Sequence, residues 1–198
     1  AVLYRDEETL IATGGGDSKI GLITEPRPGQ STTQTSPRGV ITVDIQDVLD
    51  SAQARPAAGR EMISRYDFVK EDQILAITNL GRLFIGALGD GIAWQEVTAS
   101  DELTAELKLT YVFRVVHDGA AILGTTDGTI FYVRGAEQIT RVTRVPGRVI
   151  DVSVLSKGAS ARDSDSPVEI LVHLHGSSES CYTTIDSNGA ASSYCQTK

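Results

Sequence analysis

The sequence predicts an all-β fold made of repeated antiparallel units. Three observations predict it: four segments share the layout of a β-hairpin, their turns recur at a near-constant interval, and strand-like runs lie between them. Each hairpin segment is a short apolar run, a polar turn, and a second run that tends to alternate between apolar and polar residues. The four segments are residues 10–23, 74–85, 121–133 and 170–185.

The turns set the spacing of the repeat. Placed at Ser18, Gly81, Gly128 and Ser180, they are 63, 47 and 52 residues apart. The first interval contains the polar segment 24–39, whose composition cannot bury enough surface to offset the entropy of ordering it. Without those 16 residues the intervals become 47, 47 and 52, which is close to the ~40–50-residue pitch of a four-stranded propeller blade.

Further strands are expected on either side of the hairpins. Residues 148–155 alternate between apolar and polar side chains, as a half-buried strand does. Residues 40–54 fit both a strand and a helix, so we expect mixed structure there. The other expected strands are residues 62–69 and 108–116 before hairpins and residues 94–97 and 139–142 after them.

These elements predict a β-propeller fragment of about three and a half four-stranded blades. Residues 1–23 would end one blade, and residues 24–59 would be an insertion loop with a possible short helix. Two complete blades (60–107 and 108–147) and most of another (148–198) would follow. A closed propeller needs ~4–8 blades. We therefore expect the remaining blades to come from elsewhere in a larger multi-propeller chain, which fits a sequence that starts without Met.

Composition narrows the classes of function. The 198 residues carry a net charge of -8, with 26 Asp and Glu against 18 Lys and Arg, which argues against a broad phosphate-binding surface. No apolar run approaches the ~20 residues that span a bilayer, and no signal-peptide pattern is visible. We therefore expect a cytoplasmic protein without membrane contact. A disulfide between the two cysteines, Cys181 and Cys195, would need an oxidising compartment.

The catalytic motifs that the sequence resembles are incomplete. Residues 14–19 (Gly-Gly-Gly-Asp-Ser-Lys) lack the order of a Walker phosphate loop, and Ser18 precedes all three histidines, unlike the nucleophile of chymotrypsin-like proteases. A propeller-type hydrolase would instead gather carboxylates such as Asp17, Asp72 and Asp127 at its axis, but these residues lie in predicted turns. The sequence predicts no catalytic residues and no cofactor.

His173 and His175 are the residues whose spacing could suit a metal site. Residues two apart in a strand share a face, and Cys181 is close by in the hairpin. The fourth zinc ligand would have to be Cys195, in a tail that we expect to be frayed. We therefore predict a structural histidine pair and no metal site.

Four arginines are the candidate partner- or RNA-binding residues. Arg141, Arg144 and Arg148 surround a Pro-Gly turn at 146–147, with Arg134 upstream. Guanidinium groups in such an arrangement can contact phosphate or an acidic partner. On alternating strands they can equally form a solvated face.

The order of the motifs resembles one family. Residues 10–23 resemble the end of a WD-repeat blade, with Ile-Gly-Leu-Ile at 20–23 where Val-Arg-Leu-Trp is usual and without the WD dipeptide. Residues 72–85, 94–96, 124–130 and 145–152 then follow in an order similar to the central part of a large WD-repeat family, in a fungal-type sequence. Members of that family partner the tRNA ribose 2′-O-methyltransferase that acts on the anticodon wobble nucleotide.

The resemblance implies a non-catalytic scaffold that binds the methyltransferase and positions tRNA. It implies no catalytic residues and no S-adenosylmethionine site on this chain. The acidic charge indicates that tRNA would be bound mainly by other parts of the full protein. Two alternatives stay open: a WD-repeat adaptor in vesicle-coat or ubiquitin machinery, and a propeller-type hydrolase.

Overall fold

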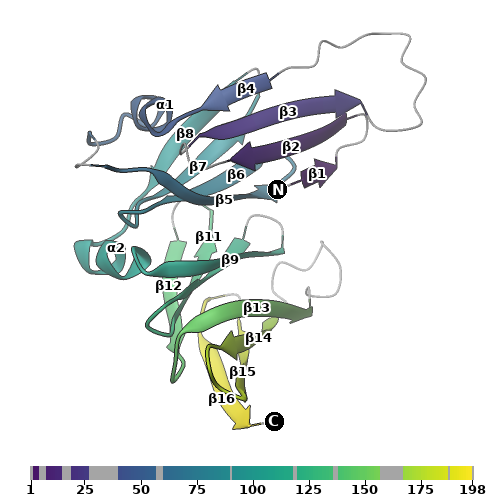
Figure 1. Cartoon of the computed structure of the whole chain (residues 1–198), viewed down its shortest axis with the longest axis vertical. Helices are drawn as coiled ribbons and strands as arrows, with labels where there is room; N and C mark the ends of the chain where they lie inside the picture. Colours follow the sequence, from purple (N-terminus) through teal and green to yellow (C-terminus); the bar gives the residue numbers. More distant parts are fainter. Residues whose placement is uncertain are drawn as a thin grey trace. The chain divides into compact units, whose positions relative to one another are not determined.

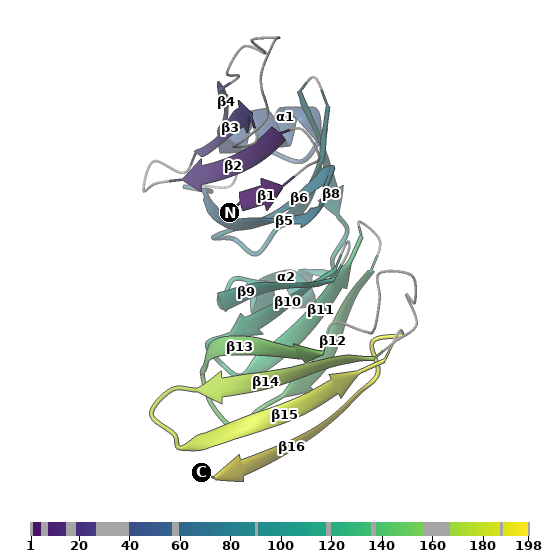
Figure 2. The same cartoon turned by 90° about the vertical axis from the view of Figure 1, so that its right-hand side faces the viewer.

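The structure is a computed structural model of the whole chain. It describes residues 2–4, 8–14, 19–26, 40–56, 60–89, 91–117, 120–135, 138–156, 167–186 and 188–197. Within these residues, sixteen strands and two short helices build four antiparallel sheets, which confirms the predicted all-β class (Figures 1 and 2). Neither helix in the described part of the chain has the length and apolar surface to cross a membrane.

Each sheet is a four-stranded meander in which consecutive strands pair. The first contains β1 (Val2–Tyr4), β2 (Glu8–Gly14), β3 (Ile20–Pro26) and β4 (Val40–Val43). The second contains β5 (Ile63–Lys70), β6 (Gln73–Thr78), β7 (Leu83–Leu88) and β8 (Ile92–Val97). The third contains β9 (Thr110–His117), β10 (Ala120–Thr125), β11 (Thr129–Arg134) and β12 (Gln138–Arg144). The fourth contains β13 (Val149–Ser156), β14 (Val168–Leu174), β15 (Glu179–Ile185) and β16 (Ala191–Thr197). Helix α1 (Ile45–Ser51) follows β4, and α2 (Asp101–Leu107) follows β8.

The four predicted hairpins are present as β2–β3, β6–β7, β10–β11 and β14–β15. Three of their turns contain a glycine in the left-handed region, with φ of 83° at Gly81, 91° at Gly128 and 67° at Gly176. The prediction of a turn at Ser180 is wrong: this residue lies inside β15, because the chain turns earlier, at Gly176. The turn glycines are 47 and 48 residues apart, so the correction makes the repeat more regular. Residues 15–18, including Asp17 and Ser18, lie outside the described residues.

Both ends of the chain contain more strands than predicted. The first sheet has four strands rather than the half blade expected, because β4 lies within the segment assigned to an insertion loop. Residues 40–54 do combine a strand with a helix, as their mixed pattern predicted. Residues 191–197 form β16, which pairs with β15 along its whole length. The expectation of a frayed tail there is wrong. β16 is a polar strand, which β15 stabilises by pairing and which lacks the apolar alternation by which strands are predicted from sequence.

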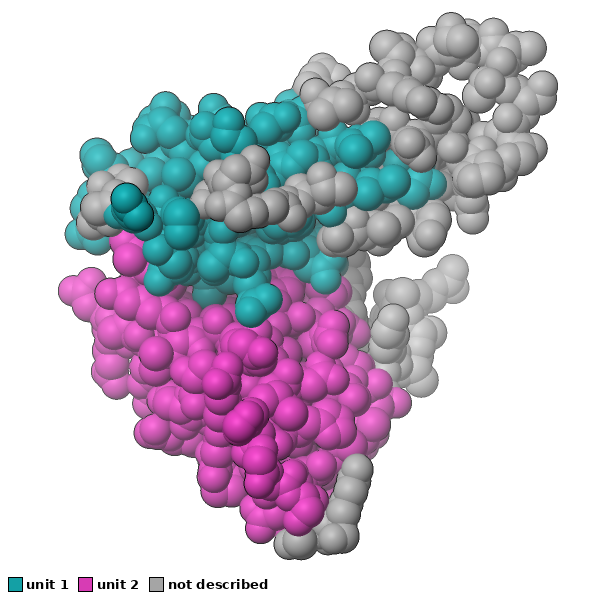
Figure 3. Space-filling model, viewed as in Figure 1, with its two compact units in different colours: residues 1–79, 83–96 teal, residues 80–82, 97–198 magenta. Residues whose placement is uncertain are grey.

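The chain divides into two compact units (Figure 3). Unit 1 comprises residues 1–79 and 83–96, and its core contains apolar side chains of the first two sheets. Asp44 caps α1 by accepting hydrogen bonds from the N–H groups of Gln46 and Asp47, and the helix buries Val48 and Leu49 in that core. Helix α1 therefore fills space beside the sheets of unit 1.

Unit 2 comprises residues 80–82 and 97–198, and it contains the third and fourth sheets. Its core draws on both sheets, with Ile122 and Tyr132 from the third and Val152, Val172 and Cys181 from the fourth. The first strands of the two sheets, β9 and β13, lie side by side, and the last strands, β12 and β16, are also in contact. The two sheets therefore pack face to face with matching strand order (Figure 2).

The first strands of the second, third and fourth sheets share an irregularity. In each, a residue near the start is skipped by the pairing with the next strand, and so is a residue five positions later. The skipped residues are Ser64 and Val69 in β5, Tyr111 and Val116 in β9, and Ile150 and Leu155 in β13. Paired β-bulges at matching positions show that these three sheets repeat in backbone detail as well as in strand order.

Candidate functional site on the third and fourth sheets

The four predicted arginines all belong to unit 2, but they do not form one cluster. Arg134 ends β11 opposite Gln138, whereas Arg144 ends β12 opposite Thr129, so the two lie at opposite ends of the third sheet. Arg148 lies directly before β13, after the turn that follows β12. The charge of Arg134 opposes the rise in the pKa of Tyr132 that burial causes.

Arg141 is held by two carboxylates of α2. Its Nε donates to Glu106 Oε2 at 3.1 Å and its Nη2 to Glu102 Oε1 at 3.2 Å, while a second hydrogen bond from Nη2 reaches Glu106 Oε1. The two glutamates are four residues apart and share a face of the helix. The hydrogen bond with Glu102 and the charge of Glu106 raise the pKa of Arg141. This guanidinium therefore fixes α2 against β12.

Arg144 binds Asp127 in the β10–β11 turn. Its Nη2 lies 3.2 Å from Asp127 Oδ2, and its Nε donates to the Asp127 carbonyl at 3.2 Å. Asp127 Oδ1 also accepts from the Thr125 hydroxyl at 2.5 Å and the Thr129 N–H at 3.3 Å. Partial burial raises the pKa of Asp127, but the hydrogen bonds from Thr125 and Thr129 and the charge of Arg144 together lower it. Asp127 therefore lies in a turn, as the sequence predicted.

The lowered pKa of Asp127 predicts a loss of stability in acid. Because its folded-state pKa lies below the unfolded value of ~3.9, the ionised carboxylate stabilises the fold above that pH, and the contribution disappears as pH falls through the folded pKa. Urea unfolding followed by circular dichroism should show a smaller decrease in stability between pH 6 and pH 3 for Asp127→Asn than for the wild type.

Thr125→Ser is the matched control for this prediction. It keeps the hydroxyl that binds Asp127 and loses only a buried methyl group. It should lower stability at every pH and leave the acid-dependent decrease unchanged. An equal decrease in the wild type and in Asp127→Asn would contradict the assignment.

Arg148 makes a different contact from Arg141 and Arg144. Its guanidinium carbon lies 4.5 Å from the centre of the Tyr111 ring, on the neighbouring first strand. Its carbonyl oxygen accepts from the His175 N–H at 2.9 Å. Within the described ranges, no ion pair joins Arg148 to a carboxylate. Arg141, Arg144 and Arg148 surround the predicted turn at 146–147. Among these three, Arg148 is the arginine that no carboxylate of the described residues neutralises.

A polar cluster that sequence reasoning missed bridges β9, β13 and β14. Arg114 Nη2 lies 2.8 Å from Asp151 Oδ1, and Asp151 is the register partner of His173. His173 Nε2 lies 3.1 Å from the Ser153 hydroxyl oxygen. The hydrogen bond from Arg114 lowers the pKa of Asp151, with a smaller contribution from His173. The alternation of residues 148–155 does place Asp151 and Ser153 on one face, but strand register is what adds Arg114 and His173.

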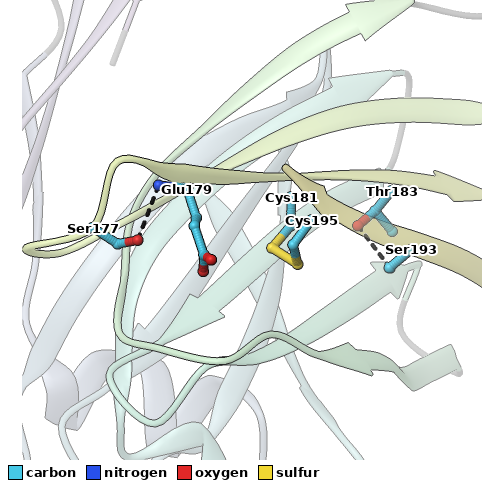
Figure 4. The surroundings of a disulfide bond; sticks show 6 residues. All are labelled: Ser177, Glu179, Cys181, Thr183, Ser193 and Cys195. Atoms are coloured by element: carbon cyan, nitrogen blue, oxygen red, sulfur yellow. Dashed lines mark hydrogen bonds between the residues drawn. A yellow bond between two sulfur atoms is a disulfide. The ribbon is translucent and has the colours of Figure 1, made fainter. Parts of the chain in front are cut away.

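The histidines do not form the predicted pair. His173 belongs to β14, whereas His175 lies in the turn after it and is exposed, so the expectation that they share a strand face is wrong. No group of three or more His, Cys, Asp or Glu side chains in the described residues is placed to hold a metal ion. Cys181 and Cys195 are instead joined in a disulfide between β15 and β16 (Figure 4).

The Ser153–His173 pair differs from a catalytic triad. Asp151 Oδ1 binds Arg114, and in the part of the chain that the structure describes no hydrogen bond links Asp151 to the imidazole of His173. A triad needs that bond to fix the histidine tautomer. Of the carboxylates considered for a hydrolase, Asp72 is exposed in the β5–β6 turn of unit 1, Asp127 binds Arg144 in unit 2, and Asp17 lies outside the described residues.

No protein-family model matches the chain, and no curated protein matches it in sequence.

Proposed function

We propose that the chain is a segment of a WD-repeat-like β-propeller that acts as a non-catalytic interaction scaffold. The observation that carries this proposal is the packing in unit 2, where β9 lies beside β13 and β12 contacts β16. Neighbouring propeller blades meet in this way, first strand to first strand and outer strand to outer strand. The turn glycines 47 and 48 residues apart and the repeated bulges of β5, β9 and β13 add support.

The partner we propose is a tRNA ribose 2′-O-methyltransferase, in keeping with the order of the motifs along the chain. Arg141 and Arg144 are each bound by carboxylates of the same chain, which weakens their capacity to neutralise phosphates. In this proposal the full-length protein positions tRNA mainly through surfaces outside these residues. The remaining blades belong to the same longer chain.

Affinity capture of the full-length protein tests this proposal. Tagged protein should recover a tRNA 2′-O-methyltransferase, and tRNA recovered with it should be lost at high salt because phosphate contacts are screened. Recovery of vesicle-coat or ubiquitin-ligase subunits would support the adaptor alternative and overturn the methyltransferase assignment. A hydrolytic activity that Asp127→Asn abolished without unfolding the protein would overturn the non-catalytic scaffold.

A further inference from the structure

Four exposed residues within or directly before the start of β9 and β13 form what we call the first-strand patch: Leu109, Tyr111, Arg148 and Ile150. The side chains of Leu109, Tyr111 and Ile150 are 41%, 40% and 40% exposed, and Arg148 is also exposed. All four belong to unit 2. Large apolar side chains gathered at one place on a surface are typical of a binding site.

The backbone presents this patch through bulges. Tyr111 and Ile150 are the residues that the pairing of β9 and β13 skips, while their neighbours Val112 and Val149 are buried. These two valines converge over Gly124, where a Cβ atom would lie 2.7 Å from Val149 Cγ1 and 3.4 Å from Val112 Cβ. The bulges thus allow the valines to pack inside while Tyr111 and Ile150 stay at the surface. Bulges commonly direct a side chain toward a functional site.

Arg148 gives the patch its charge. Its guanidinium carbon lies 4.5 Å from the centre of the Tyr111 ring, and within the described residues no carboxylate is paired with it. Arg114, Arg141 and Arg144 each bind a carboxylate of the same chain. A guanidinium held over an aromatic ring can still donate its N–H groups to planar acceptors such as carboxylates. The patch therefore combines apolar contact area with one positive charge held against an aromatic ring.

We propose that the first-strand patch is the docking surface for a protein segment that presents an Asp or Glu carboxylate next to a large apolar side chain. The carboxylate would pair with Arg148, and the apolar side chain would cover Tyr111, Leu109 and Ile150. Tyrosine and arginine are the residue types that most often dominate the binding energy of protein interfaces. This inference rests on the proposed scaffold function and names its contact surface and the chemistry of its partner.

A nucleic-acid strand is the less favoured occupant. A base can stack on Tyr111, but its backbone would need several uncompensated cations near the patch. Arg114 is paired with Asp151 and Arg144 with Asp127, and the whole chain carries a net charge of -8. One carboxylate matches the one guanidinium of the first-strand patch better than a run of phosphates does.

Selection from a displayed library of random dodecapeptides, with the full 198-residue chain as target, tests the proposal. Recovered peptides should contain Asp or Glu within about two residues of a large apolar side chain. Their affinity should fall about tenfold for Arg148→Ala and for Tyr111→Ala, and should be largely retained for Tyr111→Phe, which keeps the ring. Tyr194→Ala, which removes an exposed tyrosine of β16, is the matched control and should bind like the wild type.

Two outcomes of the binding experiments would overturn the inference. One is recovery of peptides without an acidic residue, or with affinities unchanged by Arg148→Ala. The other is tighter binding of a twelve-nucleotide oligouridine RNA that Tyr111→Ala abolishes, which would assign the patch to nucleic acid. Capture by the full-length Arg148→Ala protein separates this inference from the scaffold function: methyltransferase recovered equally by wild type and variant would retain the scaffold and reject the patch.

Discussion

Replacing Gly128 with alanine is expected to destabilise unit 2 by about 3 kcal/mol or more. Gly128 has φ of 91°, where an L-residue is strained. A Cβ atom there would lie 2.4 Å from the Val145 carbonyl oxygen and 2.7 Å from the Gly147 carbonyl oxygen. Both obstacles are backbone atoms, so a side-chain rotation cannot relieve the overlap. Urea unfolding by far-UV circular dichroism, with hydrogen exchange across β10 and β11, measures the loss.

Two other glycines separate conformational strain from steric overlap. Gly135 has φ of 63°, and a Cβ atom added there would meet nothing within 4 Å, so Gly135→Ala should cost only the strain, about 1 kcal/mol. Gly91 also has open space where a Cβ atom would lie, and its φ is not positive, so Gly91→Ala should be close to neutral. Equal effects of Gly128→Ala and Gly135→Ala would mean that the segment 145–147 moves away easily, against this argument.

For this turn, the sequence predicted the local conformation but not the packing around it. The Asp-Gly pair at 127–128 between two apolar runs predicted a tight hairpin turn. The packing of residues 145–147 against Gly128, with the Val145 N–H donating to the Gly128 carbonyl at 2.9 Å, depends on the path of the chain after β12. No local sequence pattern predicts the path that the chain takes after β12.

Apolar runs on either side of turn residues predicted the hairpin strands, and alternation predicted β13, because a half-buried strand must alternate. β16 lacks a strong apolar pattern, because β15 supplies its pairing and little of the strand needs to be apolar. β4 (Val-Ile-Thr-Val) is apolar, but residues 40–54 as a whole fit both a strand and a helix. In the candidate site, too, the sequence predicted one part, and the other part became visible only in the structure. The arginines could be identified by residue type, but Glu102 and Glu106, which bind Arg141, lie on α2, and Tyr111, which binds Arg148, lies at a bulge.

The Cys181–Cys195 disulfide joins register partners on β15 and the exposed edge strand β16 (Figure 4). Besides backbone pairing, two side-chain contacts join β16 to β15: the Tyr182 and Tyr194 ring centres lie 5.3 Å apart, and the Thr183 and Ser193 hydroxyls are 2.8 Å apart. In a reducing compartment such as the expected cytoplasm the disulfide would be open. The stability of β16 therefore depends on where the protein resides.

Opening this disulfide should release β16 and leave the rest of unit 2 folded. The cysteines are 14 residues apart, and closing a loop of that size stabilises by up to about 3 kcal/mol in the chain-entropy model. Cys181 is fully buried and would remain in the core as a small apolar side chain, whereas Cys195 lies on the exposed strand. Hydrogen exchange in residues 191–197 should therefore rise strongly on reduction or in Cys195→Ser, while exchange in β14 changes little.

Ser193→Ala is the matched control, because it removes one cross-strand hydrogen bond from β16 and keeps the disulfide. It should change exchange in β16 far less than Cys195→Ser does. Unchanged protection of β16 after reduction would show that backbone pairing with β15 and the Tyr182–Tyr194 contact are sufficient to hold the edge strand. The fourth sheet would then keep all four strands in a reducing compartment, and the disulfide would not be needed to hold β16 there.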